Sequence, residues 1–155
     1  MFEFKDCKWN YLYRGKRLGN KEWCVGNLVL SDDADEDYRA IIIPMVGSRM
    51  FSNGNADEGC HIGFEKWYQV DNATICRCTG KTDKIGKLIW ENDIVRADNG
   101  NLYKAFWQDD HYQFSWMCVK SEKLPIGVKW NFDCFRGYEM EIIGNAFDNL
   151  ELLEV

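Results

Sequence analysis

Residues 79–98 read TGKTDKIGKLIWENDIVRAD. Glycines, lysines and aspartates in it surround two short apolar runs, at residues 88–90 and 94–95. Short apolar runs between turn-forming residues are typical of strands, because a helix needs apolar residues repeated at spacings of three and four. The stretch therefore predicts a turn, a strand, a second turn and a second strand.

Glycine and aspartate residues mark the turns predicted in this stretch. We expect Gly80 to end a preceding strand, and Asp83 and Gly86 to shape the first turn, where the aspartate side chain bonds nearby backbone amides. Asp93 closes the second and tighter turn, at residues 91–93. We interpret these four residues as structural, so replacing Asp93 with alanine is expected to lower the melting temperature.

Similar turn signals divide the rest of the chain into short segments. Asn99-Gly100 is the strongest hairpin signal, because both residues accept a positive φ. The loop GNK at residues 19–21 joins two further expected strands, and the alternating segment YEMEII at 138–143 predicts a half-buried strand that turns at Gly144 and Asn145. The predicted fold is mainly β, either all-β or α+β, with small, bent, barrel-like antiparallel sheets and little helix.

A chain of 155 residues suits one domain or two very small ones. The longest expected loop is rich in Gly, Asn and Ser and covers residues 46–60, which is where we place an internal boundary. This predicts an N-terminal β-hairpin unit at residues 1–64 and a small C-terminal β-barrel-like unit at 65–155. A single domain with one shared core is the alternative.

Charge and cysteine content restrict the partners and the compartment. The net charge of −6 disfavours broad attraction to nucleic acid. No apolar run approaches the roughly 20 residues that span a bilayer, and the first ten residues lack the apolar centre of a secretory signal. The seven cysteines are an odd number, which favours free thiols in a reducing compartment. We expect a cytoplasmic protein with no membrane contact.

Metal-binding and catalytic patterns are weak. Cys76 and Cys78 are separated by one residue, whereas structural zinc sites usually place two to four residues between paired ligands. The two histidines, His61 and His111, lie in a Gly-rich loop and beside an acidic turn, and no nucleophile elbow is present. We therefore predict no metal, no cofactor and no catalytic residue. An enzyme that pairs one histidine with a cysteine stays open as a third interpretation.

The segment GKTDKIGKL at residues 80–88 only superficially resembles a phosphate-binding loop. It has one residue too many between its two glycines, and Leu88 stands where a serine or threonine would hold magnesium. We therefore predict that these lysines and glycines serve the fold and do not hold a nucleotide.

The candidate binding residues lie near the N-terminus. Arg14, Lys16, Arg17 and Trp23 place cations beside an aromatic ring, a combination that binds single-stranded nucleic acid through phosphate contacts and stacking. The competing interpretation is that these charges protect a strand edge from pairing with another sheet. The acidic balance of the remaining chain favours edge protection.

Three segments resemble one known family of proteins. They are YRGKRLGNKEWCVGNLV, CTGKTDKIGKLIWENDIVRAD and YEMEIIGNAFDNLELLE, at residues 13–29, 78–98 and 138–154. Together they are similar, in the same order, to the opening, centre and ending of the YopX family of bacteriophage and prophage proteins. The resemblance implies a β-rich fold and a phage or prophage origin in a bacterial cytoplasm, and it implies no activity.

The chain departs from the family pattern at three turns. Residues 19–22 read GNKE where the family has DNGE, Asn92 replaces a glycine, and Leu150 replaces a proline. Because these changes fall in turns, we expect them to alter local stability more than chemistry. We predict a non-enzymatic phage accessory protein that contacts a bacterial host protein or a second copy of itself. The alternative is a nucleic-acid-binding module that uses the basic and aromatic N-terminal hairpin.

Overall fold

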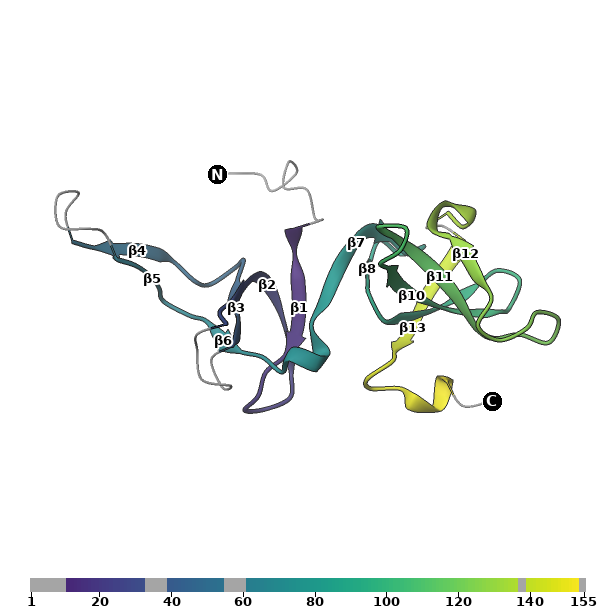
Figure 1. Cartoon of the computed structure of the whole chain (residues 1–155), viewed down its shortest axis with the longest axis horizontal. Coiled ribbons are helices and arrows are strands. Elements are labelled where there is room, and N and C mark those ends of the chain that lie inside the picture. Colours follow the sequence, from purple (N-terminus) through teal and green to yellow (C-terminus); the bar gives the residue numbers. More distant parts are fainter. Residues whose placement is uncertain (1–10, 33–38, 55–60, 137–138, 154–155) are drawn as a thin grey trace. The chain divides into compact units, whose positions relative to one another are not determined.

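The computed structural model describes residues 11–32, 39–54, 61–136 and 139–153 (Figure 1). The described chain divides into two compact units, an N-terminal unit at residues 11–76 and a C-terminal unit at 77–153. The sequence-based boundary after residue 64 precedes this division by one short strand and one turn of 3₁₀ helix.

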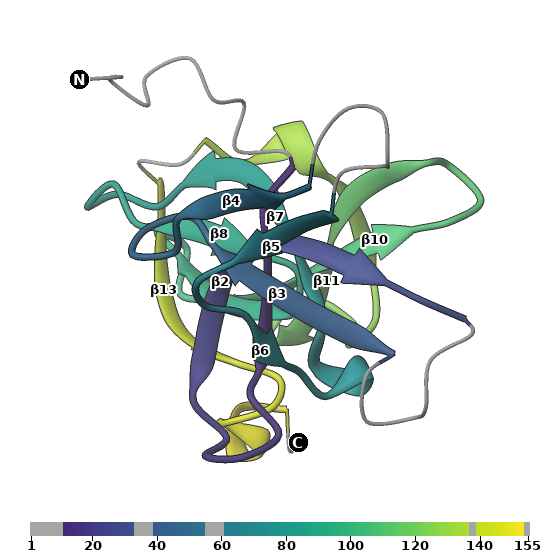
Figure 2. The ribbon, with the colours of Figure 1, turned by 90° about the vertical axis from the view of Figure 1, so that its left-hand side faces the viewer.

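The N-terminal unit contains a four-stranded antiparallel arrangement and a separate hairpin, seen in Figure 2. The four strands lie in the order β6-β3-β2-β1, and β4 pairs with β5 to form the separate hairpin. Their bounds are β1 Tyr13–Lys16, β2 Trp23–Leu30, β3 Ala40–Pro44, β4 Met50–Asn53, β5 His61–Phe64 and β6 Tyr68–Gln69. A 3₁₀ turn, η4 at Asn72–Thr74, follows β6, and the Asp71 side chain caps it by accepting from the Ala73 amide.

The core of the N-terminal unit lies on one face of these strands. Alternate residues of a strand point to opposite faces, so one face collects the buried side chains. The buried members are Cys24, Ala40, Ile42 and Val70, and Tyr13, Leu28, Tyr68 and Ile75 pack against them. Gly15 packs tightly within this core, because an added Cβ would lie 3.1 Å from the Val70 side chain.

The C-terminal unit is built on a five-stranded antiparallel sheet in the order β12-β11-β10-β9-β13. Strand β7 begins at Cys76, the last residue of the N-terminal unit, and pairs with β8. The bounds are β7 Cys76–Thr82, β8 Leu88–Trp90, β9 Asp93–Ala97, β10 Leu102–Gln108, β11 Gln113–Lys120, β12 Lys129–Asn131 and β13 Met140–Asn145. Two 3₁₀ turns complete the unit, η5 at Phe132–Cys134 and η7 at Leu150–Leu152. The predicted mainly β fold with little helix is confirmed.

The prediction of barrel-like sheets needs one correction. The five-stranded sheet stays open, because its edge strands β12 and β13 do not pair with each other in the part of the chain that the structure describes. Two separate cores explain the open form. One includes Tyr103 and Trp116, and the other includes Ile94, Leu102 and Val119, against which the C-terminal turn packs. The apolar residues of the sheet are therefore buried without closure around a single interior.

Two of the predicted hairpins form as expected. Gly100 has a φ of 82° and donates its amide to the Ala97 carbonyl at 2.9 Å, which joins β9 to β10. In the first hairpin the Arg17 amide donates to the Glu22 carbonyl at 2.9 Å, which leaves residues 18–21 as the turn, one residue more than the expected GNK at 19–21.

Strand β7 does not end at Gly80, as the sequence suggested. It continues to Thr82, and the register with β8 shifts between Cys78 and Thr82. Gly80 has a φ of 78°, so it supplies the positive φ of a β-bulge within the strand. Glycine in a strand pattern can mark either a strand end or a bulge, and the local sequence does not separate the two.

Candidate interaction surface on the N-terminal unit

Three of the four predicted binding residues share one face of the first hairpin. The register pairs Arg14 with Val25 and Lys16 with Trp23, and paired residues of an antiparallel sheet point to the same side. The Arg14 guanidinium carbon lies 4.5 Å from the centroid of the Trp23 ring, and the Lys16 ammonium lies 5.5 Å from it. Cations at these distances are attracted to the electron-rich face of indole. We call Arg14, Lys16, Trp23 and Val25 the hairpin face.

Arg17 is separated from the hairpin face. Its guanidinium carbon lies 3.4 Å from the centroid of the Tyr68 ring, and one of its nitrogens lies 3.6 Å from the Glu22 carboxylate. Alternation along β1 explains the separation, because Arg17 has the same parity as Gly15 and Tyr13, whose side faces the core. The four predicted residues therefore belong to two sites.

The hairpin face continues into exposed aliphatic residues that sequence reasoning missed. Val25 is 40% exposed and Val29 is 44% exposed, and both alternate with Trp23 along β2. Ile41 of β3 is paired with Val29, and Trp67, just before β6, is 44% exposed. The spacing of Trp23, Val25 and Val29 in the sequence was the signal that could have found this row, since alternate strand residues share a face.

Asp83 is buried beneath the first turn of the 79–98 stretch. Its Oδ1 atom accepts from the amides of Ile85 at 3.0 Å and Lys87 at 2.9 Å, and its Oδ2 atom accepts from the amide of Ile142 on β13 at 3.3 Å. Gly86 supplies a φ of 85° in the same turn. A single carboxylate thus holds the turn together and ties it to the edge of the five-stranded sheet.

Asp93 is also buried and accepts from the Trp90 amide at 2.8 Å across the second turn. Asn92 adopts a φ of 68° there, a conformation that asparagine tolerates better than most residues. The asparagine that replaces the glycine of the family pattern therefore keeps the geometry of this turn.

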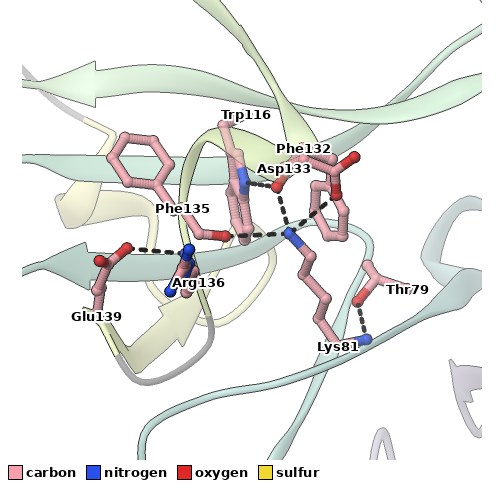
Figure 3. A network of polar contacts seen from close by, with 8 residues as sticks. All are labelled: Thr79, Lys81, Trp116, Phe132, Asp133, Phe135, Arg136 and Glu139. Atoms are coloured by element: carbon pink, nitrogen blue, oxygen red, sulfur yellow. Dashed lines mark hydrogen bonds and ion pairs between the residues drawn. The ribbon is translucent and has the colours of Figure 1, made fainter.

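Lys81 anchors the turn η5 (Figure 3). Its ammonium donates to the carbonyl oxygens of Phe132 and of Phe135, the second at 3.1 Å, and lies 3.6 Å from the exposed Asp133 carboxylate. The Trp116 indole donates to the same Phe132 carbonyl at 3.1 Å and stacks on the Phe132 ring. Lys81 belongs to the segment at residues 80–88 that superficially resembles a phosphate-binding loop, and it is engaged with backbone carbonyls.

Gly144 and Asn145 shape the end of β13. A Cβ at Gly144 would lie 2.4 Å from the Asn149 side-chain oxygen, so no larger residue fits without displacement. The Asn145 side-chain oxygen accepts from the amides of Phe147 at 2.9 Å and Asp148 at 3.0 Å. These contacts reverse the chain and lead it into η7.

The residues considered for catalysis or metal binding are two exposed histidines and two buried cysteines. His61 is exposed on β5, and His111 is exposed in the turn after β10, where its Nδ1 atom lies 3.2 Å from Asp110. The hydrogen bond from His111 lowers the pKa of the Asp110 carboxyl. Cys76 and Cys78 are both fully buried. Within the described ranges, no three His, Cys, Asp or Glu side chains come close enough to hold a metal ion.

Two other cysteines, Cys24 and Cys118, are buried, and burial lowers the reactivity of their thiols. Burial raises the pKa of the Cys24 thiol in the N-terminal core and of the Cys118 thiol in the C-terminal core. A raised pKa reduces the thiolate fraction, so these thiols are poor nucleophiles at neutral pH. They pack as small apolar side chains.

Fold and surface together define a two-unit antiparallel β protein whose N-terminal unit carries a cation–aromatic face. The YopX protein family model matches residues 12–154, and the chain belongs to this family. The crystal structure of protein EF1440 from Enterococcus faecalis is similar, with a TM-score of 0.54 and 24% identity over 92% of this chain and 96% of that one. This likeness supports the fold alone. No curated protein matches the chain. Among the described residues, no helix has the length and apolar character to cross a bilayer.

Proposed function

We propose that the chain is a non-enzymatic accessory protein of a phage or prophage that binds another protein in the bacterial cytoplasm through the hairpin face of its N-terminal unit. The observation that carries the proposal is the stacking of Arg14 and Lys16 on Trp23 directly beside Val25. The partner is a host protein or a second copy of the chain.

The composition of the hairpin face suits a protein partner. Tryptophan and arginine are the residue types that most often dominate the binding energy of protein interfaces. Apolar residues at the centre of an interface lose their water on binding, while flanking cations fix orientation and speed the encounter. The exposed side chains of Val25 and Val29 extend the apolar surface of the Trp23 ring.

Nucleic acid fits the same surface less well. Only Arg14 and Lys16 among the predicted cations share it, because Arg17 packs on Tyr68. Each phosphate contact adds to affinity through release of counterions, so two cations on a chain of net charge −6 supply little attraction. The adjacent valines offer no hydrogen bond to a base.

The proposal is tested by affinity capture from lysate of a prophage-carrying bacterium, with and without nuclease. We expect the tagged chain to retain a defined protein after nuclease treatment, and Lys16→Glu to reduce its recovery. Lys129→Glu is the matched control, since Lys129 is an exposed lysine on β12 of the other unit. Light scattering of the purified chain tests the case in which the partner is a second copy. The proposal would be contradicted if light scattering shows a monomer and the material captured from the lysate is lost on nuclease treatment.

A further inference from the structure

Two shallow pockets of the N-terminal unit share one wall, the side chain of Trp67. The first, of about 410 Å³, has a mixed polar and apolar lining that includes Arg17, and the second, of about 320 Å³, is apolar. The first is lined by Arg17, Gly19, Asn20, Trp67, Tyr68 and Gln69. The second is lined by Val29, Leu30, Ser31, Ile41 and Trp67.

Arg17 gives the first pocket its chemical preference. The guanidinium carbon lies 3.4 Å from the centroid of the Tyr68 ring, and the Arg17 side chain is 26% exposed. A guanidinium held by an aromatic ring presents its N–H groups at fixed positions that match a carboxylate. The Asn20 and Gln69 side chains add amide groups to the same wall.

The chain itself shows that a carboxylate suits this position. The Glu22 carboxylate lies 3.6 Å from the Arg17 guanidinium and accepts from the Asn20 side-chain amide at 2.7 Å. Glu22 is 70% exposed, and its distance from Arg17 is longer than a hydrogen bond. An incoming carboxylate can therefore approach the guanidinium more closely than Glu22 does.

The second pocket complements the first. Leu30 is 62% exposed and Val29 is 44% exposed, and both residues line, with Trp67, a hollow that contains almost no polar surface. A large aliphatic side chain placed there would remove this apolar surface from water, which favours binding. Asp32 follows Ser31 of this pocket in the chain, so the carboxylate of a ligand belongs at the Arg17 end.

We infer that the two pockets together hold a short segment of a protein partner in which a carboxylate side chain lies one or two residues from a large aliphatic side chain. The carboxylate pairs with Arg17 in the first pocket, and the aliphatic side chain enters the second on the other side of Trp67. This inference rests on the proposed function and names the chemistry of the partner that the N-terminal unit recognises.

The test is selection of binders to the whole chain from a displayed library of random peptides, with the Trp67→Ala chain for counter-selection. We expect the enriched peptides to combine Asp or Glu with Leu, Ile or Phe at a spacing of one or two. Synthetic copies should bind about tenfold more weakly when their acid is changed to an amide, as expected for loss of a charge-assisted pair. The inference would be overturned if the enriched peptides are basic, or if they bind the Trp67→Ala chain as well as the wild type.

Two substitutions test the pockets without disturbing the core. Arg17→Lys keeps the charge but loses the planar fork, and Leu30→Ser changes an exposed side chain of the apolar pocket. Both should weaken the selected peptides, whereas Glu22→Gln should tighten them because the competing carboxylate is gone. If a captured protein depends on Lys16 but binds the Arg17→Lys and Leu30→Ser chains normally, this inference fails while the proposed function stands. If the captured protein binds the Lys16→Glu chain normally but binds the Arg17→Lys and Leu30→Ser chains more weakly, the hairpin face is not the binding surface and the proposed function fails.

Discussion

Asp83→Ala tests the structural role of the 79–98 stretch. The carboxylate is 5% exposed and accepts hydrogen bonds from three backbone amides, those of Ile85, Lys87 and Ile142. Bonds to a charged acceptor contribute about 1.5–3 kcal/mol each, but the turn residues 84–87 are exposed, so water replaces part of the loss. At about 1 kcal/mol for each amide, we expect the free energy of unfolding to fall by about 3 kcal/mol.

For a chain of this size, a loss of about 3 kcal/mol lowers the melting temperature by about 6–12 °C, measurable by calorimetry or circular dichroism. Asp83→Asn should have an intermediate effect, because its amide group can accept from only one side. Asp109→Ala is the matched control: it removes an exposed carboxylate and should change stability by less than about 0.5 kcal/mol. A stabilising role for the Asp83 carboxylate is contradicted if Asp83→Ala has the melting temperature of the wild type, or if Asp109→Ala lowers the melting temperature equally.

Substitutions at Gly144, Asn92 and Lys84 test individual contacts. Gly144→Ala should lower the free energy of unfolding by about 1–3 kcal/mol through overpacking, and Gly19→Ala, where an added Cβ meets nothing within 4 Å, should be nearly neutral in the same denaturant titration. Asn92→Ala should destabilise by about 1 kcal/mol and Asn92→Gly should not, because only alanine resists the positive φ; equal melting temperatures would count against this. The Lys84 ammonium lowers the pKa of the Glu141 carboxyl, so this pair stabilises the fold at neutral pH and loses its effect as the pH falls through the lowered pKa. Carboxyl NMR of Lys84→Met should show the pKa of Glu141 moving upward, and an unchanged titration would contradict the assignment.

The sequence predicted the strands and most turns because these depend on local chemistry. Asn99-Gly100 specified its hairpin, and the apolar runs of the 79–98 stretch became β8 and β9. Gly80 shows the limit of such reasoning, because a glycine can serve a strand end or a bulge and the choice depends on the partner strand. The sequence also did not predict that the sheet stays open, because this depends on which apolar residues contact one another in the folded chain.

The binding surface was predicted in part. Arg14, Lys16 and Trp23 were found because cations and an aromatic ring are visible in the sequence, and the hairpin register brings them together. Arg17 was grouped with them because proximity along the chain does not reveal the face on which a residue lies. Trp67 was missed because its pockets are lined by residues from β2, β3 and the first hairpin loop, which only tertiary structure assembles.

Site-specific photo-crosslinking in bacterial cells tests protein binding through the hairpin face. A photoreactive amino acid replaces Val25, which is 40% exposed on the hairpin face, and in a parallel chain replaces Tyr112, which is 83% exposed on the C-terminal unit. We expect a discrete protein adduct from position 25 that survives nuclease, and none from position 112. Adducts from position 112 alone, or an adduct from position 25 that nuclease removes, would contradict protein binding through the hairpin face.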